Sequence, residues 1–111
     1  MIISFQTPEE RWVTTTWETP IFVGEIGIKS VMFVPAGPIF PDGGTFRLVV
    51  GDGKEDIAWL MVDQDIRRFQ IVSFHVEPHP ATYRILTLRK EISMGKNIAI
   101  PGCLIQVESW Q

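Results

Sequence analysis

Residues 45–62, TFRLVVGDGKEDIAWLMV, decide the fold class of this chain. Two apolar runs, Thr45–Val50 and Asp56–Val62, flank a turn in which Asp52-Gly53 can supply the positive φ that a tight hairpin requires. The stretch therefore predicts an antiparallel β-hairpin. Because the second run does not alternate strictly between apolar and polar residues, a short helix over Asp56–Met61 is the alternative.

The rest of the chain has the same pattern of short apolar runs separated by turn residues. Nine glycines and eight prolines interrupt its 111 residues, which leaves little room for helices of ordinary length. About eight or nine strands at a spacing of roughly ten residues are typical of antiparallel sandwiches and barrels. We expect one all-β domain over residues 1–111, an antiparallel β-sandwich with a jelly-roll-like arrangement. A small closed β-barrel is the alternative.

Charge and hydropathy argue against several classes of partner. The formal net charge is −3, and the basic residues never cluster beyond two in a row, so we expect no nucleic-acid partner. No apolar run approaches the roughly 18 residues of a membrane span, so we expect no membrane partner. The first residues lack the basic region and long apolar stretch of a signal peptide, which predicts synthesis in the cytosol.

Residues 74–80, FHVEPHP, hold both histidines of the chain and end a predicted strand that begins at Ile66. Val72, Phe74 and Val76 share one face of this strand, and we expect that face to point into the core. In a continuing strand, His75, Glu77 and His79 would share the opposite face, and could form a two-histidine, one-carboxylate metal site. Same-face side chains along one strand lie about 6.5–7 Å apart, and the prolines on either side of His79 end the ladder. A simple strand end is therefore favoured, and we predict no metal or other cofactor.

Cupins are the relevant comparison for such a site. They are small β-sandwich-like barrels that use a His-x-His pair, a glutamate and a distant histidine. This chain has no His-x-His pair, no third histidine and no glycine before the first candidate ligand. Because of these departures, a cupin-like metal-dependent enzyme using His75, Glu77 and His79 is kept only as the second alternative. Ser73 and Cys103 lack a nucleophile-elbow context, so we predict no catalytic residues and no enzymatic activity.

Apolar residues in irregular segments point to an interaction surface instead. Residues 35–44, PAGPIFPDGG, contain three prolines and three glycines, so Ile39 and Phe40 lie in a loop. An exposed aromatic loop is costly for a lone protein, so these residues either fold back under the loop or dock on a partner. Trp110 also suggests docking, because a chain end frays unless it is tied down. We predict that these three residues contribute to an interface.

The favoured function is therefore a non-enzymatic structural or interaction protein. It would form a homo-oligomer or join a larger assembly, for example as a small decoration or cement protein of a virion. The first alternative is a carbohydrate-binding β-sandwich module that stacks sugars on Trp12 and Trp17. These two residues fall on opposite faces of one predicted strand, so one of them should face outward. Trp59, in contrast, is expected in the core.

Overall fold

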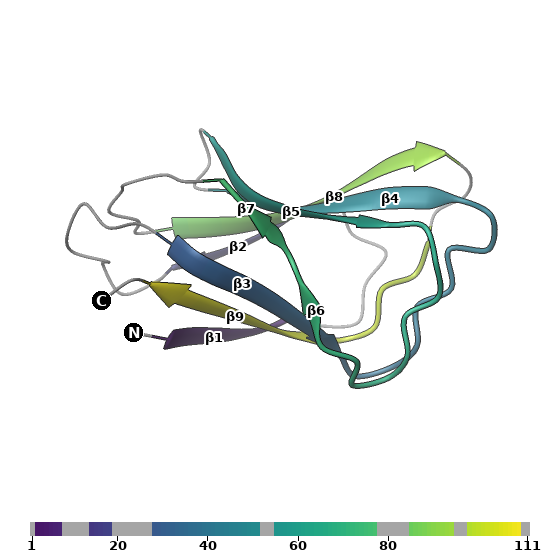
Figure 1. Cartoon of the computed structure of the whole chain (residues 1–111), viewed down its shortest axis with the longest axis horizontal. Coiled ribbons are helices and arrows are strands. Elements are labelled where there is room, and N and C mark those ends of the chain that lie inside the picture. The colour runs from purple at the N-terminus through teal and green to yellow at the C-terminus, as the bar shows by residue number, and fades with distance from the viewer. Residues whose placement is uncertain are drawn as a thin grey trace.

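The computed structural model describes residues 2–7, 14–18, 28–51, 55–77, 85–94 and 98–109. These residues form strands in two antiparallel sheets that face each other (Figure 1). The first sheet has the order β1 (Ile2–Thr7), β9 (Cys103–Ser109), β3 (Ile28–Pro35), β6 (Val72–Ser73). The second has the order β2 (Thr14–Glu18), β8 (Ile85–Met94), β4 (Thr45–Gly51), β5 (Asp56–Val62), β7 (His75–Val76). Within this described part, no helix is long and apolar enough to cross a membrane.

The strands pair in the scheme of a jelly roll. Pairing runs from the ends of the chain inwards: β1 with β9, β2 with β8, β3 with β6, and β4 with β5. Successive pairs fall alternately in the two sheets, as happens when one long antiparallel hairpin is rolled up on itself. The predicted all-β sandwich is confirmed. The described strands form two open sheets and not the closed barrel that was the alternative.

The hairpin predicted over residues 45–62 is confirmed. β4 and β5 pair from Phe46 opposite Val62 to Val50 opposite Ala58, so this region is a strand and not a helix. The register shifts at Gly51, where an added Cβ would lie 2.7 Å from the carbonyl oxygen of Glu55. Only glycine tolerates so close an approach of two backbones. The turn residues 52–54 lie outside the described residues.

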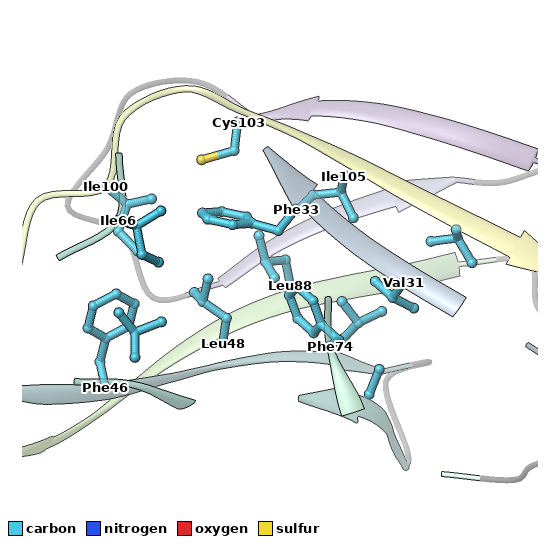
Figure 2. Close-up of a cluster of buried hydrophobic side chains, with 14 of the residues drawn as sticks. Val31, Phe33, Phe46, Leu48, Ile66, Phe74, Leu88, Ile100, Cys103 and Ile105 are labelled. Atoms are coloured by element: carbon cyan, nitrogen blue, oxygen red, sulfur yellow. The ribbon is translucent and has the colours of Figure 1, made fainter. Parts of the chain in front are cut away.

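The core lies between the two sheets, as Figure 2 shows. Phe33 and Ile105 enter it from the first sheet, and Phe46 and Leu48 enter it from the second, each fully buried. The ring of Phe33 meets that of Phe74 edge to face, with centroids 6.4 Å apart, a favoured geometry for aromatic pairs. One continuous apolar core therefore joins the two layers.

One charged side chain also enters this interior. Lys90 of β8 is 2% exposed and donates a hydrogen bond from Nζ to the carbonyl oxygen of Ile98 at 2.7 Å. A buried ammonium group is tolerated only where polar groups satisfy it. Lys90 thereby fixes the segment at residue 98 against β8.

The segment 72–76 passes from one sheet to the other. Its β6 part pairs with β3, and its β7 part pairs with β5. Between them the backbone N–H of Phe74 donates to the carbonyl oxygen of Val31 at 2.9 Å. Phe74 is buried, and Val72 and Val76 pack partly buried against the core. This confirms the face predicted to point inward and leaves His75 and Glu77 on the outer side.

Candidate interaction site

The predicted metal ligands are only partly brought together. His75 Nε2 lies 3.0 Å from Glu77 Oε1, and their side chains are 53% and 56% exposed. His79 lies outside the described residues. Among the residues that the structure describes, no group of three His, Cys, Asp or Glu side chains gathers in the way a metal ion requires. The His75–Glu77 pair is thus an exposed contact at a sheet margin.

Trp59 lies on the outer face of β5, so its expected place in the core is wrong. The inward positions of β5 are Ala58, Leu60 and Val62, which pair with inward positions of β4. Strand alternation then places Trp59 outside. There it is half-buried, and its ring centroid lies 4.8 Å from that of His75.

The other tryptophans of the prediction are not placed by the structure. Trp12 and Trp110 lie outside the described residues. Trp17 is described through its backbone, which pairs with Leu86 across β2 and β8. The carbohydrate platform on Trp12 and Trp17 therefore stays a prediction.

Ile39 and Phe40, both predicted at an interface, lie on opposite sides of their loop. Ile39 is fully buried in the core, and its backbone bridges to Ile66 through hydrogen bonds of 2.9 and 3.0 Å. Its side chain is therefore not part of the protein surface, because it fills the interior under the loop. Phe40 is 59% exposed. Ile39 therefore folds back under the loop, whereas Phe40 stays accessible to a partner.

Two irregular segments, residues 36–44 and 63–71, lie side by side at one end of the sandwich (Figure 1). Besides the Ile39–Ile66 bridge, the N–H of Phe69 donates to the carbonyl oxygen of Pro35 at 2.7 Å. The N–H of Ala36 donates to the carbonyl oxygen of Gly102, also at 2.7 Å. Backbone hydrogen bonds thus fasten this end to β3 and to the start of β9.

A pocket of about 330 Å³ opens beside these loops on the outer face of the first sheet. Gln6, Leu104 and Val34 form one row across its floor, because they pair in register on β1, β9 and β3. We call it the Phe69 pocket; its lining residues are Gln6, Val34, Ala36, Phe69, Gly102, Cys103 and Leu104. Its lining is mainly apolar and its size falls at the small end of protein binding pockets. Such a hollow fits apolar side chains.

Phe69 holds an unusual backbone conformation at the wall of this pocket. Its φ is +63°, and its side chain is 59% exposed. The turn is closed by the N–H of Gln70 donating to the carbonyl oxygen of Arg67 at 3.1 Å, and by the N–H of Arg67 donating to Gln70 Oε1 at 3.0 Å. A bulky residue at positive φ is an outlier that costs roughly 1–3 kcal/mol. Folding stability alone does not explain a phenylalanine here.

No pattern in the sequence marks Phe69 as a surface residue. The apolar pattern that begins at Ile66 predicted an unbroken strand up to Glu77, whereas the described strand begins at Val72. Arg67 and Arg68, next to an aromatic residue, carry no turn signal of the glycine or proline kind. The exposed Phe69 was thereby assigned to a regular strand.

A second feature of the surface is an ion-pair network on the outer face of the second sheet. Arg89 contacts both Asp56 and Glu91, and Arg47 Nη2 lies 2.9 Å from Glu91 Oε2. The hydrogen bond from Arg89 is the main cause that lowers the pKa of Glu91, and burial only partly opposes it. These charges are paired with one another within the sheet, so this face needs no charged partner to compensate them.

Comparisons with protein-family models, with curated proteins and with solved structures found no match.

Proposed function

We propose that the protein is a non-enzymatic structural or interaction protein that associates with further copies of itself through the Phe69 pocket. The observation that carries the proposal is the exposed, strained Phe69 at the pocket wall. Strain of this kind persists where the surrounding structure imposes it, and it gathers at functional sites. An aromatic side chain held out beside an apolar hollow is suited to anchor a protein contact.

The surroundings of the pocket support an interface. Phe40, Phe69 and Ile71 are 59%, 59% and 67% exposed, and all three lie in or next to the paired loops of residues 36–44 and 63–71. Single exposed apolar residues are ordinary, whereas several at one end of a small domain mark an interaction site. Aromatic residues are enriched in interfaces, and two of these three exposed residues are phenylalanines.

A decoration or cement protein of a virion is a concrete form of this proposal. In that role, copies of a compact β domain join a shell through apolar loops. The jelly roll by itself does not select this role, because one fold serves many functions. The proposal therefore depends on the pocket.

Replacing Phe69 by glycine tests the proposal. Glycine adopts positive φ without strain, so the variant keeps the turn and loses only the aromatic anchor. We expect the native chain to form oligomers in native mass spectrometry and sedimentation velocity, and Phe69→Gly to shift them towards monomer. Met61→Gly is the matched control, because Met61 is also exposed (48%) but lies on β5, outside the pocket lining. A monomeric native chain, or oligomers indifferent to Phe69→Gly, would overturn the proposal.

A further inference from the structure

The first sheet ends at a strand that is suited to pair with another chain. Among the described strands, β1 has the single neighbour β9, and Figure 1 shows it along the margin of its sheet. Its sequence, IISFQT, contains no charged residue and no proline. Proteins usually protect edge strands with such residues, because an edge offers unpaired N–H and C=O groups. β1 shows neither of these protections.

We propose that two copies of the chain join by antiparallel pairing of β1 with β1 around a two-fold axis. The first sheets of the two copies then form one continuous sheet. This inference rests on the proposed function and names its contact. A two-fold contact brings the same surface from both copies together. Backbone hydrogen bonds along the edge then supply the affinity, as in other cases of strand addition.

Strand alternation limits the register of this pairing. Ile2, Ser4 and Gln6 are exposed, and they occupy the outer face of the sheet. A two-fold axis perpendicular to the sheet keeps both outer faces on one side, so an outer residue must lie opposite an outer residue. Two registers then pair most of β1, one centred on Ser4 and one centred on Phe5.

The register centred on Ser4 explains the exposure of Ile2. It places Ile2 of one copy opposite Gln6 of the other, whereas the register centred on Phe5 leaves Ile2 without an opposite residue in β1. Ile2 is 61% exposed in the single chain. Directly opposite residues have Cβ atoms about 4.5–5.5 Å apart. The second copy thus brings an isoleucine to the row of Gln6, Leu104 and Val34 at the floor of the Phe69 pocket.

The charges on this face do not oppose the approach of a second copy. Glu108 on β9 lies opposite Ile2 of β1, and Glu108 Oε1 lies 3.7 Å from Lys29 Nζ. Ser30 also donates to Glu108 Oε1 at 3.3 Å. The acidic group nearest Ile2 on β9 is therefore compensated within its own copy, and the central residues of the contact are neutral.

A charge swap at Ser4 tests both the contact and its register. In the Ser4-centred register, Ser4 of one copy lies directly opposite Ser4 of the other. Ser4→Lys therefore places two ammonium groups opposite each other, and Ser4→Glu places two carboxylates opposite each other. Like charges directly opposite weaken strand pairing, and we expect each variant alone to dissociate at about fivefold higher concentration than the native chain. An equimolar mixture of the two, with the Ser4→Glu chain labelled with nitrogen-15, should regain the native dissociation constant. The label gives the mixed dimer its own mass in native mass spectrometry. Met61→Lys, on the other sheet, should change nothing.

The outcomes separate this inference from the proposed function. Weaker association of Ser4→Lys, its recovery when Ser4→Glu is mixed in, and weaker association of Phe69→Gly support both. If Phe69→Gly dissociates the oligomer while Ser4→Lys does not, the β1 contact is wrong and the pocket still mediates assembly. If Ser4→Lys weakens the oligomer and mixing with Ser4→Glu does not restore association, the Ser4-centred register is wrong. A native chain that stays monomeric overturns both.

Discussion

The guanidinium carbon of Arg68 lies 4.4 Å from the centroid of the Phe69 ring. A cation over an aromatic face is attracted by the ring, by about 0.5–1 kcal/mol at an exposed site. The contact favours the position of the phenyl group beneath the guanidinium. Arg68 therefore orients the side chain that the proposed function uses, and its charge stays at the surface.

Substitutions at Phe69 should separate backbone strain from the loss of the ring. Phe69→Ala and Phe69→Gly both remove the ring, but alanine keeps the penalty of positive φ, roughly 1–2 kcal/mol. Part of this difference is offset by the greater freedom of glycine in the unfolded chain. We expect Phe69→Gly to be more stable than Phe69→Ala by about 0.5–1 kcal/mol in urea unfolding. Equal stabilities would show that the turn does not impose the positive φ.

Two glycines should respond to alanine for different reasons. At Gly51 a Cβ would meet the Glu55 carbonyl oxygen at 2.7 Å, so the β4–β5 hairpin must shift. At Gly43 the φ is +82° and nothing lies within 4 Å, so only the backbone conformation is penalised. We expect Gly51→Ala to lower the free energy of unfolding by about 2 kcal/mol or more and Gly43→Ala by about 1–2 kcal/mol. Denaturant unfolding of both variants measures the difference, and the reverse order would contradict the hairpin geometry.

Lys90 offers a test of how a charge is accommodated in the core. Lys90→Ala removes a buried stem and a hydrogen bond to Ile98, and we expect a loss of about 2–4 kcal/mol of stability. Lys90→Met keeps most of the volume and removes the charge that must be desolvated, so it should cost clearly less. Thermal unfolding of the two variants gives the comparison. If methionine is as harmful as alanine, the ammonium group itself holds this region together.

The ion-pair network predicts a dependence of stability on acid pH. Because hydrogen bonds from Arg89 hold the pKa of Glu91 below its ordinary value, Glu91 stabilises the fold above that ordinary value. This contribution is lost as the pH falls through the lowered pKa of the folded state. Glu91→Gln should therefore show a smaller loss of stability between neutral pH and pH about 3 than the native chain. An identical pH profile would mean that the exposed network is screened by solvent.

The sequence predicted those parts of the fold that local patterns control. Turn residues between two apolar runs predicted the hairpin at residues 45–62, and alternation predicted that Phe74 points inward while His75 and Glu77 point outward. Both conclusions need only a few neighbouring residues. The sandwich class followed from the spacing of the turns.

What the sequence did not predict depends on contacts between distant segments. Trp59 was expected in the core because its neighbours in the chain are apolar. Its orientation is set instead by the register of β5 on β4, which turns the side chain to the outer face. The turn at Phe69 depends on a hydrogen bond to Pro35, more than thirty residues away in the chain. The floor of the pocket joins β1, β9 and β3, which no local pattern brings together.

The pairing of strands from the ends inwards also sets the order in which the protein can fold. The β4–β5 hairpin closes a short loop and can form early, whereas β1 must wait for β9, at the opposite end of the chain. Long-range pairings slow folding, because chain entropy is lost before the contacts are gained. During synthesis on a ribosome, the uncharged β1 strand stays unpaired with β9 until residues 103–109 emerge. The pairing of this edge of β1 therefore depends on residues 103–109, which are made long after β1.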